Sequence, residues 1–184
     1  EEILGLKFKV NAFSFFQTNI EAVERLYSEA LALIPDLDSK VVYDLYCGTG
    51  TISQLMASKA KKVYGIEIVQ DSVDAAIDNA KMNNIDNCHF ICGDVKAKLD
   101  EVTEKPDMIV VDPPRMGMHD KVVEMLSSYG IEQILYISCN PNTMAMNLEK
   151  FSELGYEPVV MKVYDNFPKT KHTECVTLLV RATK

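Results

Sequence analysis

Apolar, β-branched runs alternate along this chain with amphipathic segments. Most of the runs are apolar at nearly every position, which is typical of strands buried on both faces of a sheet. They span residues 41–47, 63–68, 88–92, 108–112, 134–138, 158–164 and 175–181. Segments with a helical period separate most of them, at residues 51–59, 69–82, 118–129 and 141–154. This alternation predicts an α/β protein with a doubly wound sheet of seven strands.

The last two runs are connected differently from the others. Residues 165–173 join them and leave no room for a crossover helix, so the last strand should be antiparallel. Ahead of the sheet, residues 20–33 have a helical period, and Asn19 can cap that helix. Because composition does not change along the chain, we expect one domain over residues 1–184. It would consist of a lead-in over 1–35 and a Rossmann-like core over 36–184.

Composition and charge constrain what this chain can bind. The 184 residues are 47% hydrophobic, enough to bury a full core. The net charge of −8 opposes nucleic-acid binding, because basic patches usually supply most of that affinity. The chain opens on Glu1 and enters a structured segment at once. We therefore expect a fragment of a longer protein, with the basic contacts in the missing part. No segment has the length of a membrane span, and the first residues lack the pattern of a signal peptide. These features predict a cytoplasmic protein.

Five cysteines lie in or beside the predicted strands. Their odd number argues against a secreted disulfide framework and fits a reducing cytosol. Cys88, His89 and Cys92 suggest a metal site, but on one strand the two thiols are about 13 Å apart at ~3.3 Å per residue. They could not share one ion, so the sequence predicts no metal site.

Glycines and acids at the strand ends indicate a cofactor site. In an open parallel sheet, ligands bind beyond the carboxyl ends of the strands, where Gly48 and Gly50 form the first turn. Ser53 replaces the third glycine of the dinucleotide fingerprint. Glu67 ends the second strand and can accept ribose hydroxyls, and Asp94 follows the third and can reach the adenine amino group. A plain tight turn and solvated acids are the alternative for each residue taken alone. Together they favour an adenosine cofactor without a pyrophosphate, which is S-adenosyl-L-methionine. The predicted topology agrees, because an open sheet ending in an antiparallel hairpin is the usual methyltransferase arrangement.

Cys139 and Glu174 are candidates for catalysis. Cys139 follows the strand at residues 134–138, and Glu174 starts the last strand, so both can face the mouth of the sheet. Carbon 5 of uracil becomes nucleophilic when a thiolate adds to carbon 6, and a methyl group on a sulfonium sulfur can then be attacked. A carboxylate must afterwards remove the proton on carbon 5. Taken alone, Cys139 would more often be a buried structural residue and Glu174 a surface residue.

Asp112, Pro113 and Pro114 end the fourth strand. The two prolines lack donors and hold a rigid, extended backbone beside the expected reaction site, although a plain turn is equally compatible with them. Arg115 could contact a phosphate of the substrate. His172 reads as a loop residue. A base in folded RNA would have to flip out, or lie in a single-stranded loop, to reach a buried thiol.

Five segments of this chain stand in the order found in one enzyme family. They are Phe15-Phe16-Gln17-Thr18-Asn19, residues 44–50, Asp112-Pro113-Pro114-Arg115-Met116-Gly117, Ser138-Cys139-Asn140-Pro141 and His172-Thr173-Glu174. With them the sequence resembles the catalytic domain of the RNA uracil-5-methyltransferases, which make 5-methyluridine in tRNA and ribosomal RNA. The resemblance implies a class I S-adenosyl-L-methionine-dependent methyltransferase with RNA as its substrate. It also implies that Cys139 is the nucleophile, that Glu174 is the base, and that the cofactor contacts are Gln17, Tyr46, Thr51, Glu67, Asp94 and Asp112.

Other functions remain open at this point. The chain could methylate cytosine or an exocyclic amine, with Cys139 structural or differently used, or it could be an inactive module that binds the cofactor or RNA. Amine methylation needs neither a covalent adduct nor removal of a carbon-bound proton, so the presence of both Cys139 and Glu174 favours the uridine reaction. The family's amino-terminal RNA-binding domain and the iron–sulfur cysteine cluster of some members have no counterpart in these residues. The sequence does not choose between tRNA and ribosomal RNA, and it predicts no oligomeric state.

Overall fold

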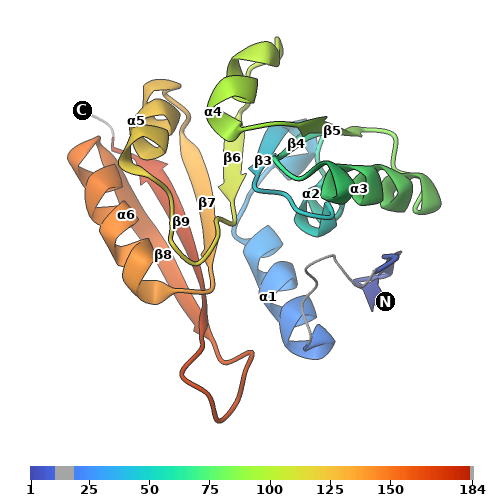
Figure 1. Ribbon diagram of the computed structural model, residues 1–184. Coiled ribbons are helices and arrows are strands. Elements are labelled where there is room, and N and C mark those ends of the chain that lie inside the picture. Colours follow the sequence, from blue (N-terminus) through green and yellow to red (C-terminus); the bar gives the residue numbers. More distant parts are fainter. Residues whose placement is uncertain (11–18, 183–184) are drawn as a thin grey trace.

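A seven-stranded sheet forms the centre of the molecule, with strand order β5-β4-β3-β6-β7-β9-β8 (Figure 1). The computed structural model describes residues 1–10 and 19–182. The strands are β3 (Val41–Leu45), β4 (Lys62–Glu67), β5 (Cys88–Cys92), β6 (Met108–Val111), β7 (Gln133–Ser138), β8 (Tyr156–Tyr164) and β9 (Glu174–Arg181). β9 runs antiparallel to both of its neighbours, and the other pairings are parallel. The predicted doubly wound sheet with an antiparallel last strand is confirmed.

Helices follow most of the parallel strands. They are α1 (Ile20–Ala32), α2 (Thr51–Ala57), α3 (Gln70–Met82), α4 (Val95–Lys98), α5 (Asp120–Ser128) and α6 (Pro141–Glu153), with short 3-10 turns at Leu37–Ser39 and Leu99–Glu101. Side chains cap three of the predicted helices: Asn19 accepts from the Ala22 amide (3.2 Å), His119 from the Lys121 amide (3.3 Å) and Asn140 from the Asn142 amide (3.2 Å). α4 and the two-residue strands β1 (Glu2–Ile3) and β2 (Leu6–Lys7) were not predicted, because elements this short show no period. Within the described residues, no helix is long and apolar enough to cross a membrane.

The sheet is covered on both faces. Val42 and Val110 belong to one apolar cluster with residues of α1 and α2, whereas Tyr43 and Ile109 belong to a second cluster with residues of α5 and α6. Neighbouring residues of a strand point to opposite faces, so the central strands β3 and β6 are apolar at almost every position. Burial on both faces is therefore confirmed for these strands.

The edge strand β8 departs from that expectation. Its side chains Val159, Met161 and Val163 are 54%, 55% and 62% exposed. The run is as apolar as the central strands, but β8 has only β9 as a neighbour in the sheet. An apolar run does not reveal whether a strand lies at the centre or the edge of a sheet, because that depends on the pairing of distant segments.

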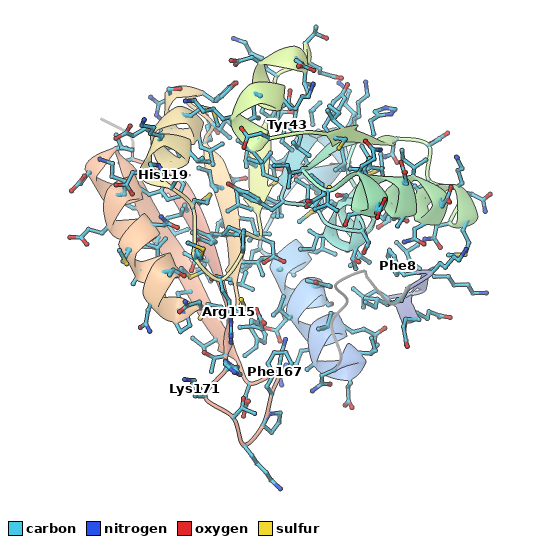
Figure 2. The ribbon with its side chains drawn as sticks, in the orientation of Figure 1. Phe8, Tyr43, Arg115, His119, Phe167 and Lys171 are labelled. Atoms are coloured by element: carbon cyan, nitrogen blue, oxygen red, sulfur yellow. The ribbon has the colours of Figure 1, made fainter. Side chains whose placement is uncertain are left out.

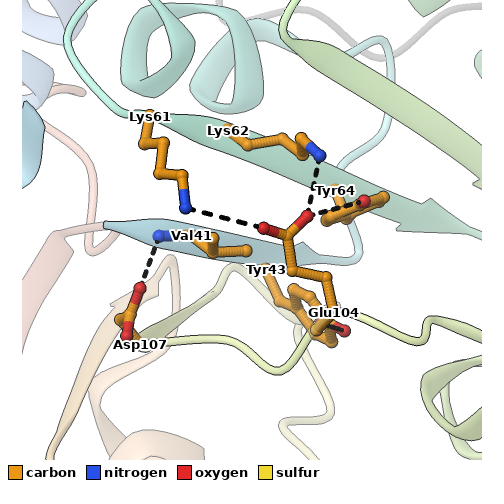
Figure 3. Close-up of polar contacts among 7 residues, drawn as sticks. All are labelled: Val41, Tyr43, Lys61, Lys62, Tyr64, Glu104 and Asp107. Carbon is orange, nitrogen blue, oxygen red and sulfur yellow. Dashed lines mark hydrogen bonds and ion pairs between the residues drawn. The ribbon is translucent and has the colours of Figure 1, made fainter. Parts of the chain in front are cut away.

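Polar contacts hold the amino edge of the sheet together (Figure 3). The Glu104 carboxylate accepts from Lys62 (2.7 Å) and from the Tyr64 hydroxyl (3.2 Å), and Asp107 accepts from the Val41 amide (2.7 Å). These contacts connect the starts of β3 and β4 to the segment that leads into β6. The opposite, carboxyl edge carries the loops that form the candidate site.

Candidate active site

A cavity of about 590 Å³ opens at the carboxyl ends of β3 and β6. The strand order reverses between these two strands, which is where open α/β sheets bind their ligands. Its wall includes Tyr27, Tyr46, Gly48, Thr51, Asp112, Arg115, Cys139, Phe167, His172 and Glu174. The structure therefore brings together the two candidates for catalysis and four of the predicted cofactor contacts, from segments distant in the sequence.

The turn between β3 and α2 brings backbone close to the cavity. Gly48 and Gly50 have positive φ angles of +53° and +77°. A Cβ atom on Gly50 would lie 2.7 Å from the Phe90 ring and 2.9 Å from the Ala76 side chain. Glycine is thus required at position 50 by both conformation and space.

Glu67 lies at the end of β4 and supports this turn. One carboxylate oxygen accepts from the Gly48 amide (3.0 Å) and the other from the Val69 amide (2.9 Å). Because an ionised carboxylate offers about four lone-pair positions, it can accept further hydrogen bonds from a ligand. Glu67 is not itself in the wall of the cavity, counting the described residues.

Two other predicted cofactor contacts are not placed in the cavity wall by the described residues. Asp94 is exposed and caps α4, accepting from the amides of Lys96 (3.0 Å) and Ala97 (3.3 Å). It too is absent from the described part of the cavity wall. Gln17 lies outside the described residues. Their roles stay predictions.

Cys139 follows β7 and is half-buried in the cavity wall. Burial raises the pKa of its thiol, and the carboxyl groups of Glu174 and Asp112 raise the pKa further. Arg115 lowers the pKa of the same thiol through a hydrogen bond and its positive charge. The resting thiol is protonated at neutral pH, and Arg115 favours its ionised form.

Glu174 is the first residue of β9 and is 3% exposed. Burial raises the pKa of its carboxyl group to about 7, although the nearby Arg115 acts in the opposite direction. A carboxyl group with a pKa near neutrality can accept a proton readily at physiological pH. The position of Glu174 thus suits a general base.

Asp112 and Tyr27 line the cavity, and the buried Asp44 influences the pKa values of both. Asp44 is fully buried at the end of β3, and burial raises its pKa to about 7 even though the Ser53 hydroxyl donates to it (2.5 Å). Burial and the neighbouring Glu174 and Asp44 hold the pKa of Asp112 well above its usual range. Tyr27 of α1 lines the cavity, and burial, with Asp112 and Glu174, raises the pKa of its hydroxyl.

Sequence reasoning missed Tyr27 as a member of the site and gave Asp44 no role of its own. Tyr27 stands on the apolar stripe of the predicted helix 20–33, so its position is also that of a core residue. Asp44 stands inside the apolar run 41–47, and a lone acid within a buried strand was the available signal.

Arg115 is held from two sides. The Asn140 side-chain amide (2.9 Å) and the Thr143 hydroxyl (3.2 Å) both donate to its backbone carbonyl. Its guanidinium group contacts the ring of His172. His172, expected to be a plain loop residue, therefore lies in the cavity wall against Arg115.

Comparison with known proteins places this geometry in context. Residues 4–182 match a family model described as tRNA (Uracil-5-)-methyltransferase. The chain is 49% identical over 181 residues to an uncharacterized RNA methyltransferase of Clostridium acetobutylicum, covering 98% of this chain and 40% of that protein. It is 49% identical over 182 residues to one of Caldanaerobacter subterraneus subsp. tengcongensis, covering 99% and 40%. The chain thus spans about two fifths of the length of these relatives.

Solved structures agree in fold. The tRNA (uracil-54, C5)-methyltransferase of Pyrococcus abyssi, in complex with S-adenosyl-L-homocysteine, superposes with a TM-score of 0.84 at 29% identity, over 98% of this chain and 43% of that one. A precorrin-6y C5,15-methyltransferase of Geobacter metallireducens gives a TM-score of 0.73 at 15% identity, over 95% of each chain, which is a likeness of fold alone. The fold is that of the class I S-adenosyl-L-methionine-dependent methyltransferases.

Proposed function

The chain belongs to the tRNA (uracil-5-)-methyltransferase family, and from that premise we propose that it methylates carbon 5 of a uridine in RNA through a covalent adduct with Cys139. The observation that carries the proposal is the meeting of Cys139 and Glu174 in one cavity beside the glycine turn. A nucleophile and a base are both needed for this reaction, whereas methylation of an exocyclic amine needs neither.

The residues present fit S-adenosyl-L-methionine as the cofactor. The turn at Gly48 and Gly50 allows close approach of a ligand to the backbone, and Glu67 has acceptor positions left for ribose hydroxyls. Tyr46 and Thr51 line the cavity next to this turn. When bound, the cofactor supplies an electrophilic methyl group.

The first step belongs to Cys139. The thiol first releases its proton to solvent, and the thiolate sulfur then forms a bond to carbon 6 of the uracil ring. The electrons of the carbon 5–carbon 6 double bond move toward the carbonyl oxygen on carbon 4. Carbon 5 of the resulting enolate is then the nucleophile for methyl transfer. Arg115 supports this step, because its positive charge and hydrogen bond lower the pKa of the Cys139 thiol.

The last step belongs to Glu174. Its carboxylate accepts the proton from carbon 5, and the electrons of that carbon–hydrogen bond restore the double bond. The bond between carbon 6 and sulfur breaks, and Cys139 leaves as a thiolate. With a pKa of about 7, Glu174 is partly ionised at neutral pH and can hold the proton that it receives.

Trapping of the adduct tests this proposal. Glu174→Gln should add to the ring and transfer the methyl group, but it cannot remove the proton and should remain bound to methylated RNA. Cys139→Ala should form neither adduct nor product. The measurement is a denaturing gel with labelled RNA at high concentration and S-adenosyl-L-methionine.

Cys92→Ala is the matched control, because Cys92 is a half-buried cysteine of β5 outside the described cavity wall. It should turn over normally and show no shifted band. Normal turnover by Cys139→Ala or by Glu174→Gln would remove that residue from the mechanism.

A further inference from the structure

The loop between β8 and β9, residues 165–173, extends past the carboxyl edge of the sheet beside α1 (Figure 1). Two of its residues, Phe167 and His172, line the cavity. The loop is anchored to the start of α1, because the Asn19 side chain donates to the Asn166 carbonyl (2.9 Å). The mouth of the cavity and this loop are therefore parts of one surface.

A tight turn at Phe167–Thr170 presents a lysine at its corner. The Thr170 amide donates to the Phe167 carbonyl (3.1 Å), and the Thr170 hydroxyl donates to the same oxygen (2.8 Å). Pro168 takes the second position, and Lys169 takes the third with a φ of +71°. This is the pattern of a type II turn, in which the third position favours glycine. A lysine at a position where glycine would be less strained points to a role for its side chain.

Positive charge gathers around this turn in an otherwise acidic chain. Lys169 and Lys171 are exposed, and no ion pair among the described residues involves either of them. Arg115 contacts His172 from the other side of the cavity mouth. Figure 2 shows Arg115, Phe167 and Lys171 at the same end of the molecule. Asp165 is the one acid of this loop, and Asp112 and Glu174 lie in the cavity wall, so the two exposed lysines are the cations of this loop that face solvent.

We propose that Lys169 and Lys171 bind phosphates of the RNA strand next to the nucleotide that enters the cavity. The proposal rests on the proposed function, because it takes RNA as the substrate. Phosphate contacts position a strand without reading its sequence, which leaves base selection to the cavity itself. Phe167, in the same turn, joins the phosphate-binding lysines to the cavity wall.

Salt dependence of RNA binding tests the two lysines. The probe is a fluorescently labelled, single-stranded RNA 12-mer containing one uridine, titrated with this chain in a series of salt concentrations. In single strands each phosphate contact contributes about 0.7 to the slope of log affinity against log salt. The double variant Lys169→Gly with Lys171→Gln should reduce that slope by about 1.4 and weaken binding roughly 25-fold at 0.1 M salt.

The double variant Lys59→Gln with Lys105→Gln is the control for net charge. Both lysines are exposed and lie at the amino edge of the sheet, away from the cavity. This control should bind RNA with the affinity and slope of the wild-type chain. The proposal is overturned if the loop variant keeps the wild-type slope, if the control loses as much affinity, or if the wild-type chain shows no salt-dependent binding.

Lys169→Gly separates a role in binding from a role in folding. Glycine suits the turn, so the melting temperature should stay unchanged or rise while RNA affinity falls severalfold. A fall in melting temperature with unchanged affinity would overturn the assignment of Lys169.

Methyl transfer to the same RNA, measured in parallel, distinguishes this proposal from the proposed function. Salt-dependent binding through the two lysines without methyl transfer by any chain would overturn the proposed function and keep the phosphate contacts. Methyl transfer with equal efficiency by wild type and loop variant would overturn the phosphate contacts and keep the proposed function.

Discussion

Glu174 shows how one buried side chain links the reaction to stability. Burial raises the pKa of its carboxyl group from 4.5 to about 7, so the folded protein keeps a proton that the unfolded chain has already released between these pH values. The unfolded state then binds fewer protons, and stability falls as pH rises through this window. Above pH 7 the ionised carboxylate costs the fold about 3 kcal/mol. The raised pKa that suits Glu174 to its proposed role as a base therefore destabilises the fold above pH 7.

Glu174→Gln removes that cost and keeps the shape of the side chain. We expect the variant to have a higher free energy of unfolding than wild type at pH 8, by up to about 3 kcal/mol, with the difference vanishing at pH 4. Urea denaturation at both pH values is the measurement. Glu157→Gln, at an exposed position of β8, should change nothing. A gain that is equal at both pH values would contradict the assigned pKa.

At the scale of elements, Asn147 of α6 connects the segments that carry the site. Its side-chain oxygen accepts from the Met118 amide (2.8 Å) and the Tyr136 hydroxyl (2.8 Å), and its amide donates to the Met118 carbonyl (2.8 Å). Asn147 is 4% exposed. These bonds hold the loop that carries Asp112 and Arg115 against α6 and β7, between which Cys139 lies.

Asn147→Ala should leave buried polar groups of Met118 and Tyr136 without partners. Each buried group that loses its partner costs about 1–3 kcal/mol, so we expect the free energy of unfolding to fall by roughly 3 kcal/mol. Affinity for the cofactor should fall less than in Glu67→Ala, because the turn between β3 and α2 makes none of these bonds, whereas Asp112 stands in the loop that they hold. Urea denaturation and calorimetry test the two statements. Asn142→Ala, at an exposed position of the same helix, serves as the control; equal stability of both variants would show that Asn147 is dispensable.

At the scale of the whole molecule, two halves of the sheet meet at the cavity. β3, β4 and β5 provide the glycine turn and Glu67, whereas β6, β7 and β9 provide Asp112, Cys139 and Glu174. The two candidates for catalysis thus come from one side of the point where the strand order reverses, and the predicted cofactor contacts come from both sides. A ligand bound there contacts both halves and should stabilise the entire fold.

S-adenosyl-L-methionine should therefore raise the melting temperature, because it binds the native state alone. At a concentration 100 times the dissociation constant the gain is about 2.7 kcal/mol, or roughly 5 °C or more for a domain of this size. Glu67→Ala should lose most of this shift, and Glu132→Ala, at an exposed position before β7, should keep it. The cofactor assignment would be contradicted if calorimetry detected binding of a nicotinamide dinucleotide but no binding of S-adenosyl-L-methionine or of its demethylated product.

The sequence by itself determined the order and type of the main elements and the position of the chemical groups at strand ends. Within one element, the spacing of apolar residues follows which side chains are buried, so the seven strands and the longer helices were predictable. The antiparallel end was predictable from the short connection at residues 165–173. Cys139, Glu174 and Gly50 were predictable too, because strand ends in such a sheet converge on one edge. Only the tertiary structure decided which residues share the cavity, that β8 is an exposed edge, and that Tyr27 of α1 lines the site. Those properties depend on which distant segments pack together and how much water they exclude, and no local pattern records either.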